Sequence, residues 1–354
     1  MPLLPIFALL LLAAGPCGAA QAPVLRLATW NLEHLAADVG AGCRPRSDAD
    51  YARLRDHARR LNADLIAVQE VENAAAVARL FDPNRYAIEV AREPDRDPGP
   101  CRRQPGQMRT MQRTGFVINR ARLTELGLSY RRLPDFAAIG MASQRWATRI
   151  LIEPRDGGGD GIQLLSVHLK SGCAYGRLDG RVKRRQCRLL VRQRGILEAW
   201  IDARARAGEG FVLLGDFNRQ LDQPRDDFWA AIDDGEVCTW VPDPTLGRRC
   251  RPATSHPNAG ADLVLANAGR PFPFPFNPRY PYAIDHIVPD ALTARGLVPE
   301  SYAVSDYEGD APAPSDHHPV AISLRLIHLR ARSGNKNYES RESGTTKADT
   351  NRHE

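Results

Sequence analysis

Residues 211–218 combine an apolar run with side chains that could take part in catalysis. Four apolar residues lead into Gly215, and Asp216 and Asn218 follow directly. The apolar run predicts a buried strand, and open sheets usually carry their chemistry where strands end. Asp216 would supply a charged acceptor, and Asn218 an amide that can donate to an anionic oxygen. By itself the pair is also typical of an ordinary turn.

The same arrangement, a polar side chain in or just beyond an apolar stretch, recurs along the chain. Each such residue alone has an ordinary structural explanation, but so many at strand ends are hard to explain that way. Carboxylates and amides without cysteine are hard oxygen ligands that suit Mg²⁺ or Mn²⁺. Histidines beside aspartates suit proton transfer near neutral pH. The residues concerned are Asn31, Glu33, Glu70, His168, Asp216, Asn218, Asp285, Asp316 and His317.

Strands and helices alternate among the elements that must position these side chains. Apolar residues at three- and four-residue spacing predict helices over 49–61, 74–80 and 180–206. Residues 92–113, rich in Pro, Gly and Arg, predict a long surface loop. Residues 222–257 are also rich in loop-forming residues. Strands are predicted over 25–30, 64–71, 86–90, 115–119, 146–153, 162–167, 211–214, 283–288 and 321–326.

The beginning of the chain and its cysteines predict export. An apolar run over 3–14 followed by small residues is typical of a secretory signal peptide, which we assign to residues 1–22. A membrane anchor would need ~20 apolar residues, and this run is too short to be one. Removing the signal leaves six cysteines, which in a secreted or periplasmic protein predict three disulfides. We expect neighbours to pair, Cys173 with Cys187 and Cys238 with Cys250.

The formal net charge of +6 suits a polyanion such as nucleic acid, or an anionic lipid surface. A bias of the genome toward arginine codons would also explain it, because only four of the 48 basic residues are lysine. A proline and aromatic segment over 271–282 could stack on bases, enter a lipid surface or pack on the core. One side of the predicted helix 180–206 forms a guanidinium stripe that could follow phosphates or simply be solvated. The stripe consists of Arg181, Arg184, Arg185, Arg188 and Arg192.

In the types and order of these residues, the chain resembles the endonuclease/exonuclease/phosphatase superfamily. That group includes pancreatic-type DNases, apurinic endonucleases, neutral sphingomyelinases and inositol polyphosphate phosphatases. The resemblance implies a four-layer α/β/β/α sandwich of two mixed β-sheets flanked by helices, with a catalytic domain over 23–330. The tail over 331–354 contains no Leu, Ile, Val, Phe, Met or Trp and is predicted to be disordered. The motifs, in family order, are Thr29-Trp30-Asn31, Gln69-Glu70, Ser166-Val167-His168, Gly215-Asp216-Phe217-Asn218, Ile284-Asp285-His286 and Ser315-Asp316-His317.

The resemblance also implies a divalent metal, Mg²⁺ or alternatively Mn²⁺. Glu70 should be its main ligand, with Asn31 and Asp316 bound directly or through water. Glu33 stands where many relatives carry an acidic residue.

The remaining roles concern the phosphate and the protons. The resemblance implies that Asp285 orients His317, that Asp216 and Asn218 position water and phosphate, and that His168 donates to a phosphate oxygen. The resemblance does not identify the general base that removes the proton from water. Substrate contacts are assigned to Arg145 and Lys170.

The first functional hypothesis is an exported nuclease that hydrolyses DNA or RNA. The second is a secreted phosphoesterase of the sphingomyelinase or phosphoinositide phosphatase type, with residues 271–282 meeting a membrane. The third is a non-enzymatic binding protein on the same scaffold. No protein partner is indicated.

Overall fold

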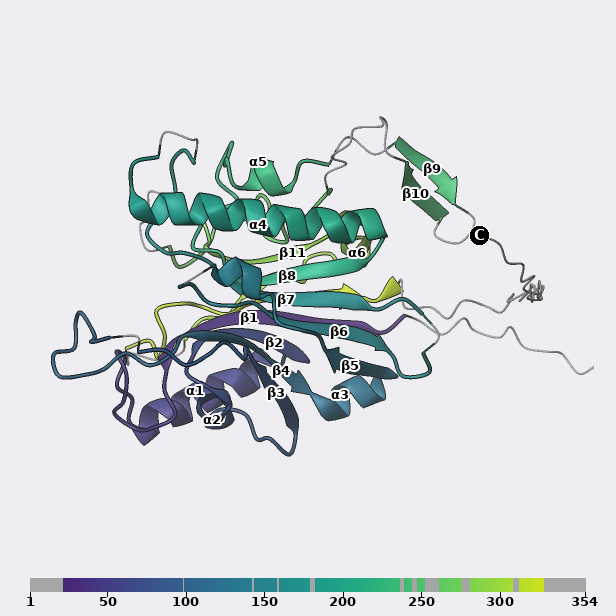
Figure 1. The fold of residues 1–354 in the computed structure, drawn as a ribbon. Helices are drawn as coiled ribbons and strands as arrows, with labels where there is room; N and C mark the ends of the chain where they lie inside the picture. The colour runs from purple at the N-terminus through teal and green to yellow at the C-terminus, as the bar shows by residue number, and fades with distance from the viewer. Residues whose placement is uncertain are drawn as a thin grey trace, which may run out of the picture.

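Two β-sheets packed face to face form the centre of the protein, and helices cover their outer faces (Figure 1). The predicted four-layer α/β/β/α sandwich is therefore confirmed. Residues 1–21 of the predicted signal peptide and the predicted polar tail lie outside the described residues. The computed structural model describes residues 22–97, 99–141, 143–157, 159–178, 182–235, 239–243, 247–251, 261–275, 281–307 and 312–327.

The first sheet is mixed and has the strand order β12-β13-β1-β2-β4-β3. Strand β1 runs parallel to β2 and antiparallel to β13. Its helices are α1 (Asp48–Leu61), α2 (Ala74–Ala78) and α3 (Arg120–Glu125). Its strands are β1 (Val24–Leu35), β2 (Leu65–Val71), β3 (Tyr86–Val90), β4 (Arg113–Asn119), β12 (Ala303–Val304) and β13 (Val320–Arg325).

The second sheet has the order β11-β8-β7-β6-β5, with β7 and β8 parallel. The long helix α4 (Arg185–Ala207) connects these two strands and covers the outer face (Figure 1). The shorter helices here are η1 (Ala137–Gly140), α5 (Trp229–Ile232) and α6 (Ala291–Ala294). The strands are β5 (Leu128–Arg132), β6 (Thr148–Pro154), β7 (Ile162–His168), β8 (Gly210–Asp216) and β11 (Asp285–Pro289), and a separate ribbon pairs β9 (Thr239–Asp243) with β10 (Gly247–Arg251).

The central strands β7 and β8 are continuous apolar runs because both of their faces are covered. Leu165 and Leu213 belong to the core beneath α4, whereas Leu164 and Val212 belong to the core between the two sheets. Successive side chains of a strand point to opposite faces, so one apolar run fills both cores. This burial fixes the ends of β7 and β8, where His168 and Asp216 stand.

Several short or irregular elements differ from the sequence prediction. The predicted helix 180–206 begins at Arg185, and Gly180 and Arg181 lie outside the described residues. The elements that the sequence did not predict are all short, with at most six residues each. They are α3, η1, β5, α5, β9, β10, α6 and β12. Within the described residues, no helix has the length and apolar character to cross a bilayer.

Two disulfides join surface segments of the protein. The predicted Cys173–Cys187 bond is confirmed, and a second bond joins Cys43 to Cys101 across 58 positions. The predicted Cys238–Cys250 pair concerns side chains outside the described part of the chain.

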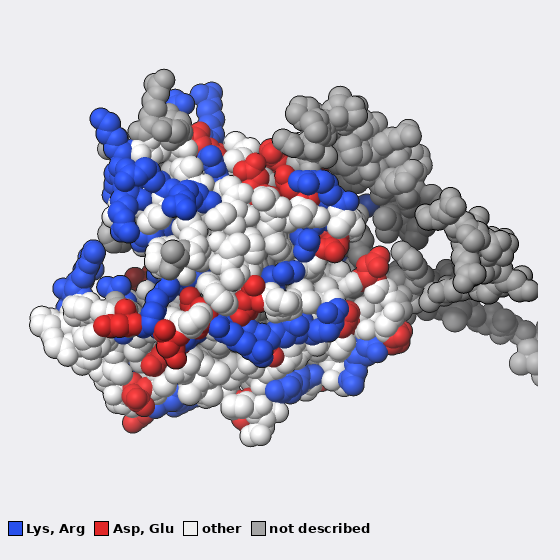
Figure 2. All heavy atoms as spheres, viewed as in Figure 1, with Lys and Arg blue, Asp and Glu red and all other residues white. Residues whose placement is uncertain are grey.

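The predicted guanidinium stripe on α4 faces solvent. Figure 2 shows Lys and Arg side chains gathered over the first turns of this helix, at the left of the view. Arg184, Arg185, Arg188 and Arg192 are exposed, and Arg181 lies outside the described residues. The exposure leaves both predicted explanations open, a phosphate contact and a merely solvated face.

Candidate active site

The polar strand ends of both sheets meet at one edge of the sandwich. In the second sheet, Asp216 pairs in register with His168 on one side and with Asp285 on the other. In the first sheet, Asn31 is in register with Gln69, the neighbour of Glu70. The structure therefore brings one group together across both sheets. This group consists of Asn31, Glu70, His168, Asp216, Asn218, Asp285 and His317.

Asp216 is the centre of this group and is almost fully buried. Its Oδ2 accepts hydrogen bonds from the Nδ2 atoms of Asn31 (3.0 Å) and Asn218 (2.9 Å), and its Oδ1 accepts from the Asn218 backbone N–H (2.7 Å). The Nε2 atoms of His168 and His317 lie 3.4 and 3.8 Å from Oδ2. Burial raises the pKa of Asp216 to about 7, although His317 opposes the rise. The carboxyl group can therefore exchange a proton near neutral pH.

His317 forms a close pair with Asp285. Its Nδ1 lies 2.6 Å from Oδ2 of Asp285, which leaves Nε2 facing Asp216. Burial lowers the pKa of His317, but Asp285 and Asp216 outweigh burial and raise the pKa well above its usual value. The pair has the carboxylate and imidazole geometry that fixes the orientation of a histidine.

Glu70 reaches the site from an irregularity in β2. The pairing of β2 with β4 shifts register between Val68 and Val71, and Glu70 has a left-handed backbone with φ 59°. A bulge of this kind redirects a side chain, and such strain is typical of functional positions. Burial raises the pKa of Glu70, but His168, His34 and Arg145 outweigh it, so the pKa falls to about 2.

The donor set around Glu70 fits a hard divalent cation. Its Oε2 accepts hydrogen bonds from the His34 backbone N–H (3.1 Å) and from Gln112 Nε2 (2.6 Å). Its Oε1 accepts none from the described residues and lies 3.6 Å from His168 Nε2. Asp285 Oδ1 is buried without a hydrogen-bond partner in the described part of the chain. An ionised carboxylate with a free oxygen is a ligand that Mg²⁺ or Mn²⁺ accepts.

The other predicted metal ligands form a rim rather than a closed cage. The backbone N–H of Asp316 donates to Oε2 of Glu33 (3.0 Å), and the side chain of Asp316 is 67% exposed. The Asn31 amide is engaged by Asp216 and by the Glu33 backbone. A different trio, Asp216, Asp285 and His317, places one ligand atom each within 4.8 Å of one another. The same site thus contains a second arrangement of groups that could hold a cation.

The two predicted substrate-binding residues are placed differently. Arg145 donates to Gln112 Oε1 (3.0 Å), so it joins the site through Gln112. Burial lowers the pKa of Arg145, and Glu70 and Asp216 oppose this effect. Lys170 lies just beyond β7, where its Nζ donates to Ser171 Oγ (3.4 Å). Among the described residues, its side chain forms no hydrogen bond with a member of the central group.

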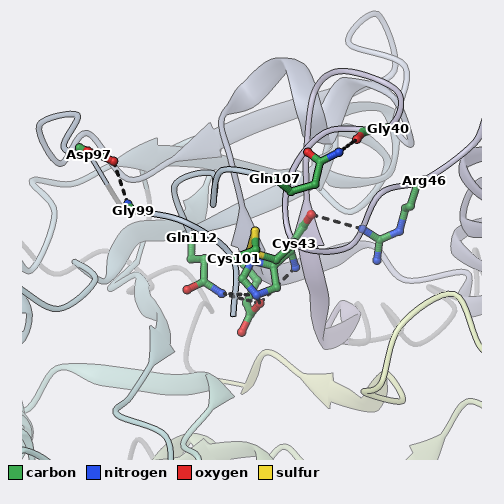
Figure 3. Close-up of a disulfide and its surroundings, with 10 residues drawn as sticks. Gly40, Cys43, Arg46, Asp97, Gly99, Cys101, Gln107 and Gln112 are labelled. Carbon is green, nitrogen blue, oxygen red and sulfur yellow. Dashed lines mark hydrogen bonds and ion pairs between the residues drawn. A yellow bond between two sulfur atoms is a disulfide. The ribbon is translucent and has the colours of Figure 1, made fainter. Parts of the chain in front are cut away.

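Sequence reasoning missed two partners of Glu70. Gln112 immediately precedes β4 in the long loop and lies close to the Cys43–Cys101 disulfide (Figure 3). His34 follows Glu33 in a left-handed turn with φ 54°. Neither residue follows an apolar run directly. His34 adjoins the predicted residue Glu33, whereas Gln112 is 42 positions from Glu70 and carries no such signal.

The chain belongs to the endonuclease/exonuclease/phosphatase family, whose model matches residues 28–317. The structure is similar to that of humanized D. rerio TDP2 carrying 14 mutations, with a TM-score of 0.51, 15% identity, and coverage of 85% of this chain and 98% of that one.

Two further solved structures align over similar lengths. The human Nocturnin catalytic domain has a TM-score of 0.49 and 13% identity, covering 85% of this chain and 93% of that one. A family protein from Bacteroides thetaiotaomicron has a TM-score of 0.48 and 15% identity, covering 86% of this chain and 98% of that one. No curated protein matches the sequence significantly.

Proposed function

We propose that the mature chain is an exported, divalent-metal-dependent phosphodiesterase that hydrolyses DNA or RNA. One observation carries this proposal. The buried carboxylate of Asp216 lies close to the imidazoles of His168 and His317, and an ionised Glu70 lies beside them. The pKa of Asp216 is raised and that of Glu70 is lowered, and two groups displaced in opposite directions suit acid and base chemistry at one site. The two disulfides support export, because such bonds persist in oxidising compartments.

Each group has a defined task in this proposal. Asp216, with a pKa near neutrality, can hold the proton of the attacking water, and Asn218 keeps its carboxylate in place. His168 stays neutral, because burial and Arg145 lower its pKa well below the usual value, and it can donate to a phosphate oxygen. A metal held by Glu70, Asn31 and Asp316 would stabilise the charge that develops on the phosphate.

His317 completes the proton transfers. Its imidazolium, held by Asp285, faces Asp216 through Nε2 and can give a proton to the departing alkoxide. The Asp285 carboxylate keeps the ring in this orientation during turnover.

The aromatic segment favours a nuclease over a lipid phosphoesterase. Phe272 packs against the core between the sheets, and Phe274 stacks on His318 with ring centroids 4.0 Å apart. These two rings are therefore engaged by the protein and are not presented to a membrane. Residues 276–280 of the segment lie outside the described part of the chain.

One experiment separates the candidate functions. Purified mature protein is incubated with plasmid DNA, RNA, sphingomyelin vesicles and bis(p-nitrophenyl) phosphate, each with Mg²⁺ and with EDTA. We expect Mg²⁺-dependent cleavage of nucleic acid and of the simple diester. Cleavage of sphingomyelin alone would support the lipid alternative, and no turnover of any substrate would support a binding protein.

The matched variants are His317→Ala and His318→Ala. Both remove an imidazole from the same segment, but His318 packs on Phe274 and its Nδ1 bonds the Ser305 carbonyl. We expect His317→Ala to lower turnover by roughly 10²-fold or more, whereas His318→Ala should retain it.

A further inference from the structure

Two basic turns lie near the candidate active site, and each is fixed by a disulfide. One belongs to the long loop before β4 and contains Arg102 and Arg109. The other is the start of α4 and contains Arg185 and Arg188. The first turn precedes a strand of the first sheet, and the second follows a strand of the other sheet. The two turns thus approach the same edge from different sheets.

The first turn is a hairpin held against a neighbouring loop. The backbone N–H of Cys101 donates to the Gln107 carbonyl, and that of Arg109 donates to the Gly99 carbonyl, both at 2.9 Å. Two links hold the hairpin against the segment that contains Gly40 and Cys43 (Figure 3). They are the disulfide to Cys43 and a 3.1 Å hydrogen bond from Gln107 Nε2 to the Gly40 carbonyl. Arg102 follows Cys101 directly, so its backbone is held in place while its side chain is exposed.

The second turn is fixed to the chain that leaves the active site. Cys187 in the first turn of α4 is bonded to Cys173, five positions after His168. The Lys170 backbone N–H donates to Gln193 Oε1 in the same helix at 2.8 Å. The exposed side chains of Arg185 and Arg188 therefore start from a backbone anchored beside the end of β7.

The charges of both turns converge on Lys170. Burial is the main cause that lowers the pKa of this ammonium group. The positive charges of Arg145, Arg185, Arg102 and Arg109 lower it further. No carboxylate is among these causes. A concentration of cations from separate segments indicates a surface suited to an anion.

These arginines also differ from those at the other end of the same helix. Arg204 pairs with Glu209 and Arg206 with Asp202, whereas Arg185 and Arg188 form no ion pair within the described part of the chain. The start of α4 has no acidic residue in its first turn and no side-chain cap. Cations at a helix start oppose the helix dipole, so their placement is unfavourable for folding. Binding of an anionic ligand would explain why they stand there.

We propose that Arg102, Arg109, Lys170, Arg185 and Arg188 form a cationic clamp that binds backbone phosphates of a polynucleotide on both sides of the bond being hydrolysed. The inference rests on the proposed function and deepens it, because a small phosphate ester would contact only the residues around Asp216. A polymer would contact these residues and both turns together. The substrate is therefore a chain of several phosphodiesters.

The test compares two double variants of one helix. Binding of a fluorescent single-stranded DNA of about 24 nucleotides is measured by anisotropy in EDTA, over a range of salt concentrations. Arg185→Gln/Arg188→Gln removes two clamp cations, and Arg204→Gln/Arg206→Gln removes two cations from the opposite end. Losing two phosphate contacts should reduce the salt slope by about 1.4, which corresponds to roughly 25-fold weaker binding at ~0.1 M salt. The control variant should bind like the wild type.

A parallel assay separates failure of the clamp from failure of the proposed function. Turnover of bis(p-nitrophenyl) phosphate and of the same DNA is measured with Mg²⁺. In the clamp variant, kcat/KM for DNA should fall far more than kcat/KM for the small diester. Equal losses for both substrates, or a salt slope identical to that of the control, would overturn the clamp. No turnover of either substrate by the wild type would instead overturn the proposed function.

Discussion

Replacing Asp285 by Asn should lower both the pKa of His317 and the rate of hydrolysis. Asp285 Oδ2 lies 2.6 Å from His317 Nδ1, and the carboxylate is buried. Asn has nearly the same shape, so the variant removes the negative charge while it leaves the packing in place. The ring would keep a neighbour at Nδ1 but would lose the main group that stabilises its protonated form.

The size of the effect follows from that one contact. A hydrogen bond to a charged group contributes about 1.5–3 kcal/mol. One pKa unit corresponds to about 1.36 kcal/mol, so the pKa of His317 should fall by roughly 1–2 units. Because the wild-type pKa lies well above its usual value, the variant should lose the proton as the pH rises through neutrality. Loss of the proton donor should reduce turnover at neutral pH by roughly 10²-fold.

Two measurements check this prediction. NMR titration of the imidazole signals in metal-free protein gives the pKa of His317, with His57 as an internal reference because Asp285 is not among the groups that shift its pKa. The pH profile of kcat with bis(p-nitrophenyl) phosphate gives the catalytic consequence, and the activity lost at neutral pH should partly return at lower pH. A His317 titration curve that is the same in both proteins would refute the role of Asp285.

Three further predictions concern the metal ligand, acid stability and the basic helix start. Gln112→Ala removes the 2.6 Å donor to Glu70 and should weaken Mn²⁺ binding by about 10- to 100-fold; unchanged affinity in a substrate-free Mn²⁺ titration would contradict this. Burial lowers the pKa of His57 from 6.5 to about 4, so the folded state disfavours its protonation. Stability due to neutral His57 is complete above pH 6.5 and is lost as the pH falls toward 4, by up to about 3 kcal/mol. Urea unfolding should show a smaller loss over this range in His57→Phe, and an identical loss would refute the assignment. Arg185→Gln/Arg188→Gln should raise the unfolding free energy by about 0.3–1 kcal/mol per charge, and a lower melting temperature would contradict the dipole argument.

The long elements of the fold could be predicted because each carries its own signal. The buried runs of β2, β7 and β8 and the amphipathic pattern of α1 are visible in the sequence. The pair β9 and β10 and the strand β5 are different, because they are defined by pairing with other strands. A short segment without an apolar run has no local reason to be a strand until its partner is known.

The site was predictable where residue type and position carried the information. Asp216, His168 and Asp285 stand in or at the end of buried strands, and the sheet register brings them together. Gln112 could not be found this way, because it comes from a loop whose path depends on a disulfide across 58 positions. The left-handed backbone of Glu70 also depends on strand pairing that is not visible locally. The roles assigned to the individual residues stay predictions.

Titration with Mn²⁺, followed by electron paramagnetic resonance, tests most directly whether Glu70 binds a catalytic cation. The variants are Glu70→Gln and Glu72→Gln. Glu72 is two positions away, but its carboxylate accepts a hydrogen bond from the backbone N–H of Ala37. The wild type and Glu72→Gln should bind Mn²⁺ with equal affinity, and Glu70→Gln should bind on the order of 100-fold more weakly. Equal binding by all three proteins would contradict a metal centre at Glu70.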